Sequence, residues 1–314
     1  MKRSIVVTSR KKNMSKIINI GSINIDHVYK LPHFVRPGET LTSSDYEIFP
    51  GGKGLNQSIA CAMAGLPVIH AGCIGNDKPW LMEVLKGLDI DTENIQVMDQ
   101  PTGHAMIQVI PSGENAIVIY PGANRFVDKE LIGKVLQKRD LADMILLQNE
   151  ISNVADAIRM AKDCGMEVVF NPAPMTPEVL QYPLELVDLF ILNQTEAYGL
   201  TGETDPPKIR DVMLNRYPKA SILLTLGSNG SMFFEANVNL FQPAISVTAV
   251  DTTAAGDTFI GYFLSYWIKH ENAARAMFLA ANAAAICVTR EGAAYSIPSF
   301  AEVLKFIIEG DEDI

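Results

Sequence analysis

Cysteine is scarce in this chain, and its four cysteines are far apart: Cys61, Cys73, Cys164 and Cys287. None belongs to a Cys-x-x-Cys pair, and no histidine cluster accompanies them. This pattern excludes a disulfide framework and gives no indication of a zinc site. Each cysteine stands among apolar residues, so we expect buried thiols in a protein of the reducing cytoplasm.

Positive charge is also limited, because 26 Lys and Arg face 36 Asp and Glu, for a net charge of −10. Without a basic surface to replace counterions, we expect neither nucleic acid nor an anionic membrane as partner. No apolar run approaches the roughly 20 residues that cross a bilayer. Residues 1–16 are basic but lack the apolar core of a signal peptide, and we expect them to form a flexible extension.

Alternating apolar strands and helical segments are what the 314-residue chain has in abundance. From residue 131 onward, buried strands are expected at 144–148, 167–170, 189–192 and 221–225, and each ends in polar or glycine-rich residues. This order predicts an α/β fold with a parallel sheet covered on both faces. Its ligand-binding edge would carry Glu150, Asn171, Asn193, Glu196, Gly227 and Asp257.

Two further stretches are extended and alternating, at about 27–50 and 102–121. They predict a small sheet that stands apart from the main one. Such a sheet is typical of a lid over a binding site. Its apolar outer face favours pairing with a second copy of the chain, so we expect a homodimer.

The segment 250–261 predicts a strand end, a turn of small residues and the start of a buried helix. We expect the strand at 241–250 and the helix at 258–268. The backbone amides around Ala254, Ala255 and Gly256 would form an anion site at the helix N-terminus. Asp257 beside them is suited to take a proton from a hydroxyl, which indicates phosphoryl transfer. A simpler reading, with the aspartates as helix caps, remains open on this segment alone.

Two N-terminal segments offer groups for a polyol. A strand at 17–20 runs into Asn24 and Asp26, which suit either ligand binding or a turn. The glycine-rich segment 51–58 then leads into a helix and supplies donors from Lys53 and Asn56. It satisfies neither the G-x-x-x-x-G-K-[ST] phosphate loop nor the G-x-G-x-x-G dinucleotide fingerprint. The small-residue helix at 280–287 could lie against a planar ring or simply pack tightly.

These segments together resemble the ribokinase-like (PfkB) family of carbohydrate kinases. The motifs occur in order: GSINID at 21–26, PGET at 37–40, GGKGLNQ at 51–57, NPAP at 171–174, NQTEA at 193–197, TLGS at 225–228 and DTTAAGDTF at 251–259. The resemblance implies a three-layer α/β/α fold with a mostly parallel central sheet and a small β-sheet lid. It implies one kinase domain over 17–298, followed by a C-terminal helix and acidic tail at 299–314.

The resemblance also implies roles for individual residues. The sugar pocket would hold Asn24, Asp26, Gly52, Lys53, Asn56, Ala105, Ile107, Glu150 and Asp257. Asp257 would be the general base, and Ala254, Ala255 and Gly256 would form the anion hole. ATP would lie along Asn193, Thr225, Gly227, Ser228, Gly230, Gly256 and Asn282, with Glu196 acting on Mg²⁺ through water. A monovalent cation, K⁺, would be bound by Asp251, Thr253, Cys287, Arg290, Gly292 and Ser296.

Within that family the chain most resembles kinases of ribose, so ATP-dependent conversion of D-ribose to D-ribose 5-phosphate is expected. Another sugar or a nucleoside remains an alternative acceptor, and so does a catalytically silent sugar-binding regulator. The presence of Asp257 and Gly256 argues against the silent alternative. His104 in the expected lid and Asn229 after the TLGS motif depart from the family pattern. We expect His104 to bear on the choice of sugar.

Overall fold

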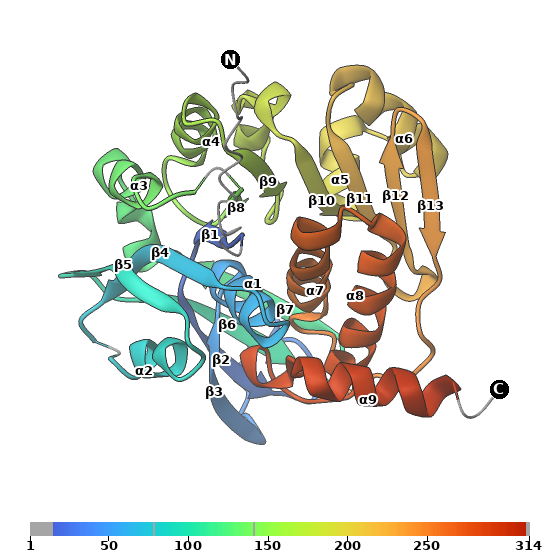
Figure 1. Ribbon diagram of the computed structural model, residues 1–314. Helices are drawn as coiled ribbons and strands as arrows, with labels where there is room; N and C mark the ends of the chain where they lie inside the picture. The colour runs from blue at the N-terminus through green and yellow to red at the C-terminus, as the bar shows by residue number, and fades with distance from the viewer. Residues whose placement is uncertain (1–14, 78, 141, 312–314) are drawn as a thin grey trace, which may run out of the picture.

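The structure is a computed structural model that describes residues 15–77, 79–140 and 142–311 (Figure 1). Most of the expected N-terminal extension, residues 1–14, and the last residues of the acidic tail, 312–314, lie outside this part of the chain. The described residues form a large sheet with helices on both faces and a smaller, separate sheet, which confirms the expected three-layer α/β/α fold with an additional small sheet.

The large sheet has nine strands in the order β13-β12-β11-β10-β9-β8-β1-β4-β5. The strands from β11 to β5 in this order run parallel to one another, whereas β12 and β13 are antiparallel additions next to β11. The strands are β1 (Ile17–Ile20), β4 (Val68–Gly75), β5 (Asp91–Met98), β8 (Met144–Gln148), β9 (Glu167–Asn171), β10 (Leu189–Asn193), β11 (Ser221–Thr225), β12 (Ser231–Glu235) and β13 (Val238–Gln242).

Two apolar clusters explain the three layers. Successive side chains of a strand point to opposite faces, so Ile17 packs in one cluster and Ile18 in the other. The first cluster is shared with α1 (Lys53–Met63), α2 (Trp80–Lys86), α7 (Ala255–His270), α8 (Ala273–Val288) and α9 (Phe300–Asp311). The second is shared with α3 (Lys129–Leu136), α4 (Val154–Asp163), α5 (Gln194–Thr201) and α6 (Pro206–Arg216).

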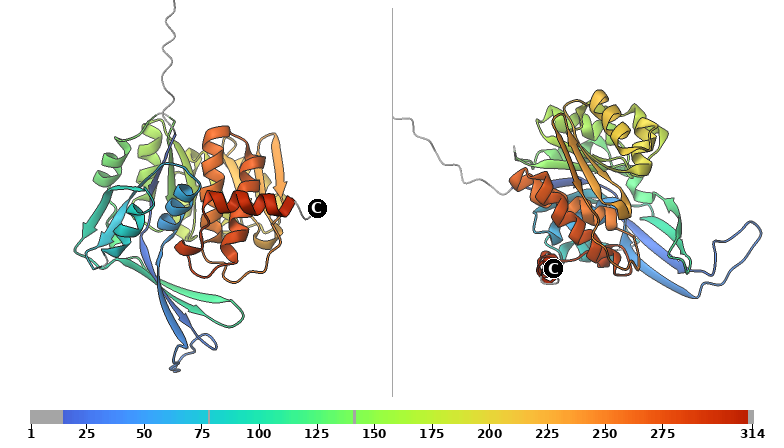
Figure 2. Two further views of the ribbon diagram at one scale, coloured as in Figure 1. Left: turned by 60° about the horizontal axis from the view of Figure 1, so that its bottom comes forward. Right: turned by 90° about the vertical axis from the view of Figure 1, so that its right-hand side faces the viewer.

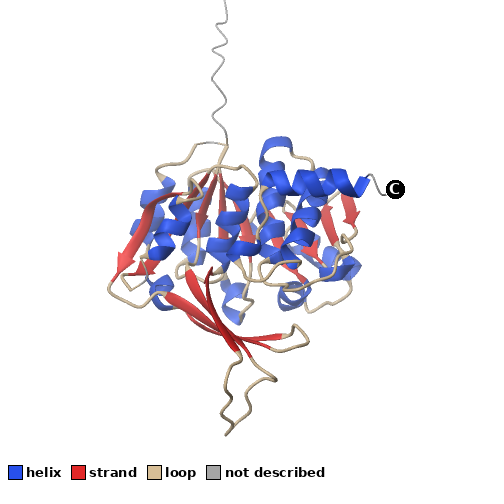
Figure 3. Cartoon of the chain, turned by 90° about the horizontal axis from the view of Figure 1, so that it is seen from below, coloured by secondary structure: helices blue, strands red, loops and turns tan. Residues whose placement is uncertain are grey.

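The smaller sheet is built from the two extended stretches and has the order β3-β2-β6-β7. Its strands are β2 (Asn24–Lys30), β3 (Asp45–Gly51), β6 (Gly103–Val109) and β7 (Asn115–Tyr120). β2 pairs with β6 in parallel, and the outer two pairs are antiparallel. Figures 2 and 3 show this sheet projecting from one side of the layered body. Within the described residues, no helix is long and apolar enough to span a membrane.

One expected strand is wrong. The sequence predicts a strand at 241–250, but β13 ends at Gln242, and residues 243–250 have no regular secondary structure. Pro243 lacks the N–H that would continue the ladder. At the far end of the segment, the amides of Val250 and Asp251 both donate to the carbonyl of Val288, at 2.7 and 3.2 Å. The segment therefore joins the end of α8 and delivers residues 251–257 to the start of α7.

Candidate active site

Helices α1 and α7 lie side by side, and their contact sets the centre of the site (Figure 1). Gly261 permits this approach, since a Cβ at that position would lie 2.3 Å from the Cβ of Ala60. Across the contact, the carboxylate of Asp257 receives two amide hydrogen bonds. The Asn56 Nδ2 donates to Oδ2 at 3.3 Å, and the Gln57 Nε2 donates to Oδ1 at 2.9 Å. Asp257 is buried but keeps 7% of its surface exposed.

The turn before α7 presents backbone amides beside that carboxylate. Ala254, the residue that caps the helix, has a φ of 60°, a conformation rare for a residue with a side chain. The Ala255 amide donates to the Thr252 carbonyl at 3.3 Å. The first-turn amides of Gly256 and Asp257 have no helical carbonyl to receive them, so they point out of the helix at its positive end. A Cβ on Gly256 would meet no atom within 4 Å, which leaves space in front of these amides. Geometrically, this turn fits an anionic group.

Lys53, at the start of α1, lies among four carboxyl groups. Burial disfavours its charged form, but Asp257, Glu150, Glu196 and Asp26 outweigh this effect and raise the pKa of Lys53. Burial in turn raises the pKa of Glu150, against the opposing effects of Lys53 and Ser22. The Glu150 carboxylate accepts from the Ser22 hydroxyl at 2.5 Å and from the Lys53 amide at 3.0 Å. The lysine and its carboxylates thus form one coupled cluster.

The carboxyl group of Asp26 belongs to the same cluster. Burial raises its pKa to about 7, with smaller contributions from Glu150 and Asp257 and an opposing one from Lys53. It faces Gly51, where any side chain would collide with the carboxylate, since a Cβ would lie 2.2 Å from it. Near neutral pH, Asp26 can therefore both accept and donate hydrogen bonds, which suits the hydroxyls of a polyol.

Asn24 lies next to Asp26 on the same face of β2. Its side-chain oxygen accepts from the Asn124 Nδ2 at 2.7 Å, which leaves its own amide N–H groups for other partners. Gly103, paired with Asn24 in the sheet, keeps this space open, because a Cβ there would lie 2.2 Å from the Asn24 oxygen. Gly52, at the start of α1, has a φ of 92°, which brings the backbone close to Asn24.

The register of the small sheet separates its two faces. Asp26 pairs with Ala105 and Val28 with Ile107, so Ala105 and Ile107 lie on the face that carries Asn24 and Asp26, and both are buried. His104 alternates with them and belongs to the opposite face, where its ring contacts His27 and Tyr120. The pleat thus turns the His104 side chain away from Asp26, and an influence of His104 on the choice of sugar stays a prediction.

The residues expected along ATP lie at the ends of β10 and β11 and in α8. Asn193 and Thr225 are paired neighbours, and Gly227 and Ser228 follow in a short 3₁₀ turn that ends at Gly230, whose φ is 103°. The Asn193 side chain caps α5: its oxygen accepts from the Glu196 amide at 3.0 Å, and its Nδ2 donates to Glu196 at 2.9 Å. Asn282 is buried in α8, where its Nδ2 donates to the Phe278 carbonyl.

Glu196 is the residue expected to act on Mg²⁺. Burial raises its pKa, while the Asn193 backbone amide and Lys53 oppose that shift. One of its oxygens also accepts from the Asn171 Nδ2 at 3.4 Å. Across the described ranges, no group of three or more His, Cys, Asp or Glu residues is placed to hold a metal ion.

The residues expected to bind K⁺ are brought together behind the turn at 254–257. Asp251 accepts from the Thr253 amide at 2.8 Å, from the Thr253 hydroxyl at 2.6 Å and from the Gly292 amide at 3.1 Å. The Cys287 Sγ lies 3.7 Å from the Thr253 carbonyl oxygen and 3.1 Å from the Ser296 hydroxyl. The Arg290 guanidinium points away, to Glu302, so only its carbonyl could take part. A carboxylate with neighbouring carbonyl oxygens fits a hard cation.

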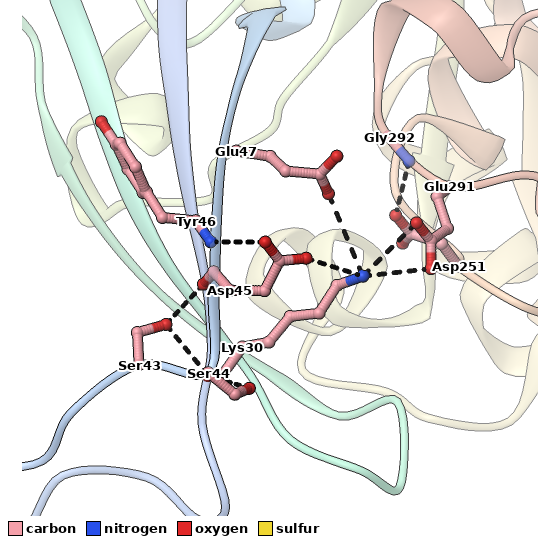
Figure 4. A network of polar contacts seen from close by, with 9 residues as sticks. All are labelled: Lys30, Ser43, Ser44, Asp45, Tyr46, Glu47, Asp251, Glu291 and Gly292. Carbon is pink, nitrogen blue, oxygen red and sulfur yellow. Dashed lines mark hydrogen bonds and ion pairs between the residues drawn. The ribbon is translucent and has the colours of Figure 1, made fainter.

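The small sheet docks on this same segment (Figure 4). The Lys30 Nζ reaches Glu291 at 3.2 Å, and it also lies 3.5 Å from Asp45 and 4.0 Å from Glu47. Next to Glu291, Gly292 lies under Phe49 of β3, where a Cβ would come within 2.9 Å of the ring. The sheet over the sugar residues is therefore in direct contact with the segment that holds Asp251.

The structure adds residues that the sequence did not single out for the site. Ser22 donates a hydrogen bond to Glu150, Asn124 donates one to Asn24, and Gln57 donates one to Asp257. Gln148, at the end of β8, holds Gln57 in turn, at 2.7 Å. Ser22 and Gln57 fall inside motifs of the sequence, but their partners are 128 and 200 positions away.

Comparisons with known proteins identify the family of the chain. The model of the pfkB family of carbohydrate kinases matches residues 14–299. Ribokinase of Haemophilus influenzae is 37% identical over 301 residues, which are 92% of this chain and 97% of that protein. Deoxyribokinase of Salmonella typhi is 32% identical over 298 residues, which are 92% of this chain and 97% of that protein.

Solved structures resemble the whole fold. Ribokinase of Cryptococcus neoformans in complex with ADP superposes with a TM-score of 0.83 at 31% identity, over 94% of this chain and 99% of that one. Ribokinase of Arabidopsis thaliana complexed with ribose and ATP gives 0.82 at 28% identity, over the same shares of the two chains. With a family model that matches most of its length and relatives above 30% identity, this protein belongs to the PfkB family of carbohydrate kinases.

Proposed function

We propose that the protein transfers the terminal phosphoryl group of ATP to the 5-hydroxyl of D-ribose, giving D-ribose 5-phosphate and ADP, with Asp257 as general base. One observation carries the assignment of the base. The Asp257 carboxylate is held by two amides directly beside the open backbone amides of the first turn of α7. A proton acceptor and an anion site adjoin there, as transfer of a phosphoryl group to a hydroxyl requires.

The acceptor is a compact polyol on this proposal. Asn24, Asp26, Lys53, Asn56 and Glu150 offer polar groups, and Gly52 with Ala105 and Ile107 shapes the pocket. The buried Asn56 Oδ1 has no hydrogen-bond partner among the residues that the structure describes, so a ligand hydroxyl can supply one. One relative is named ribokinase and another deoxyribokinase. Their two sugars differ in the 2-hydroxyl, so recognition of that hydroxyl is the property to test.

In the reaction Asp257 accepts the proton as the hydroxyl oxygen attacks phosphorus, and the bond to the ADP oxygen breaks. The amides of Gly256 and Asp257, with Ala254 and Ala255 shaping the turn, donate hydrogen bonds to the phosphoryl oxygens. Asn193, Thr225, Gly227, Ser228, Gly230 and Asn282 border the nucleotide. Mg²⁺ neutralises charge on the leaving diphosphate when bound, and Glu196 would hold its water ligands.

The K⁺ site would be formed by Asp251, Thr253, Cys287, Arg290, Gly292 and Ser296, the first four through carboxylate or carbonyl oxygens. A cation there adds positive charge beneath the anion hole. The small sheet acts as the lid that excludes water from the reaction, and residues 17–298 work as one kinase domain in the cytoplasm. Residues 299–314 would add the last helix and an acidic tail.

The outer face of the lid supports a homodimer. Tyr46, Ile48, Met106, Val118 and Tyr120 share this face, and each exposes between 46 and 68% of its surface. They form an apolar patch of a kind that monomeric proteins rarely expose. A two-fold contact between two such faces would cover it.

The experiment is coupled ADP release with ATP, Mg²⁺ and K⁺ over D-ribose, 2-deoxyribose, fructose, adenosine and uridine. The proposal expects the highest kcat/KM with D-ribose. A preference for 2-deoxyribose or a nucleoside would refute the acceptor. Asp257→Asn serves as the test of the base, and we expect its kcat to fall by on the order of 10²- to 10⁴-fold with sugar affinity retained.

A further inference from the structure

Gln57 is completely buried in α1, next to the sugar-binding candidate Asn56, and has no role so far beyond its contact with Asp257. Its Nε2 donates to the Asp257 Oδ1 at 2.9 Å and to the Asn171 Oδ1 at 3.2 Å. Both of its N–H groups are therefore aimed at oxygen atoms of the site. An amide can also turn its oxygen toward such a neighbour, so the orientation of Gln57 depends on the groups that surround its Oε1.

Three buried amides fix that direction. The Gly54 carbonyl can only accept, so the Asn19 side chain must turn its Nδ2 toward it, at 2.7 Å. The Asn19 Oδ1 then accepts from the Gln148 Nε2 at 3.1 Å. That same Nε2 donates to the Gln57 Oε1 at 2.7 Å. With its oxygen taken up in this way, Gln57 can present only N–H groups to Asp257.

The other end of this chain of hydrogen bonds is uncharged. The Asn19 Nδ2 also donates to the Ser58 hydroxyl at 2.7 Å, and Ser58 lies 2.7 Å from the His70 Nδ1. Burial lowers the pKa of His70 to about 4, against a smaller opposing effect of the Gly21 backbone, so the ring is neutral at physiological pH. Ser58 thus receives one hydrogen bond from Asn19 and shares one with the neutral His70 ring. The network of hydrogen bonds therefore does not require an ionised group at its His70 end.

Reversing Gln57 would be costly in this place. Its Oε1 would face the Asp257 carboxylate, and its Nε2 would face the Gln148 N–H groups. Asn19, Gln57 and Gln148 are each no more than 1% exposed, so water cannot compensate either contact. In a buried environment such mismatches are strongly disfavoured. The network therefore holds one orientation of the amide.

We propose that Gln57 is a positioning residue of the phosphoryl transfer, with its direction fixed by Gln148 and Asn19. Its donated hydrogen bond holds the Asp257 Oδ1, while Oδ2, which lies 3.3 Å from the Asn56 Nδ2, is the oxygen placed to take the proton of the attacking hydroxyl. The inference rests on the proposed role of Asp257 as base. It assigns a catalytic purpose to an amide chain that reaches from the active site through the sheet to β4.

The decisive variant is Gln57→Glu, which keeps the size of the side chain and places a carboxyl group against Asp257. Two adjoining carboxyl groups share a proton until higher pH. We expect the acid limb of the kcat profile to move upward by about one pH unit or more, with kcat at pH 7 lowered about tenfold and restored at higher pH. The KM for ribose should change less than about twofold, because Gln57 does not face the sugar.

Gln148→Met gives a second test that does not touch Asp257. It removes the donor that fixes Gln57, and we expect kcat to fall about threefold to tenfold while the variant folds. Ser231→Ala is the control, because that buried hydroxyl on β12 has no hydrogen-bond partner in the structure. A merely structural role would lower the melting temperature of the Gln57 and Gln148 variants and leave the pH profile of the folded enzyme unchanged.

The two hypotheses fail in different ways. If Asp257→Asn retains native turnover, the base assignment fails, whatever the Gln57 variants do. If Asp257→Asn is inactive but Gln57→Glu keeps the native kcat and pH profile, the base stands and the positioning role of Gln57 is refuted. A shifted acid limb in Gln57→Glu, together with a reduced kcat in Gln148→Met, supports the inference.

Discussion

The contact between α1 and α7 allows a sharp test of how the fold positions the site, through Gly261→Ala. A Cβ at Gly261 would lie 2.3 Å from the Ala60 Cβ and 2.6 Å from the backbone of Ala60 and Cys61. Carbon atoms in contact prefer about 3.5 to 4.0 Å, so the helices must separate by roughly 1.2 Å or more. The neighbouring atoms are the Ala60 Cβ and backbone atoms, and none of them can move by a rotamer change, so the collision cannot be relieved in that way. We expect a loss of about 1–3 kcal/mol of stability.

Activity should fall by more than stability implies. Asn56 and Gln57 belong to α1 and Asp257 belongs to α7, so a separation of about 1 Å between the helices lengthens the hydrogen bonds between these side chains. A misplacement of this size can lower the rate on the order of 100-fold. The assay measures kcat on protein shown to be folded, with urea unfolding in parallel. Gly133→Ala is the matched control, because its Cβ would meet its nearest atom, Met160 Cε, at 3.5 Å, an ordinary contact. Native kcat in folded Gly261→Ala would refute the reasoning.

Three further outcomes are expected. Asp26→Asn should stabilise the protein above about pH 7, because the folded-state pKa of Asp26 is raised from 3.8 to about 7, so its ionisation disfavours folding increasingly between these values; the gain, up to a few kcal/mol, should vanish below about pH 4 in urea titrations at several pH values. Lys30→Met should change stability by less than about 1 kcal/mol, since Lys30 and Glu291 are 39% and 58% exposed. A raised KM for the sugar at low salt that converges with the native value at high salt would link this ion pair to lid closure, and equal KM at all salt concentrations would argue against it. Exchanging K⁺ for tetramethylammonium should lower kcat, whereas unchanged kcat would count against a cation site at Asp251 and Ser296.

Most of the central sheet was predictable because its strands are buried on both faces. The run at 144–148 and the run at 221–225 are uniformly apolar between polar ends, and both strands occur with those bounds. The strand expected at 241–250 does not form, because a local pattern does not show how a segment is bonded in the folded chain. Its alternating residues satisfy a local pattern, but Pro243 ends the ladder, and the bonds of Val250 and Asp251 to Val288 are formed only in the folded chain.

The candidate site was predictable where its residues follow strands or start helices. Asp257 and Lys53 stand at helix starts, where a local pattern of small residues precedes them. Gln57, Gln148 and Asn124 could not be found in this way. Their roles consist of contacts with residues 91 to 200 positions away, and nothing in their own surroundings distinguishes them from residues that merely fill the core.

The charge of the site gives a physical reason for the proposed anion contacts to come from the backbone. Four carboxyl groups, those of Asp26, Glu150, Glu196 and Asp257, surround the single ammonium group of Lys53. A free polyphosphate would be repelled by such a cluster, so the nucleotide is expected to arrive with its charge already reduced by Mg²⁺. A further lysine or arginine near Asp257 would attract phosphate, but it would also pair with the base and hold its carboxylate back from the hydroxyl. Backbone amides at the start of α7 avoid this conflict, because they carry partial positive charge in a fixed direction and cannot fold over onto Asp257.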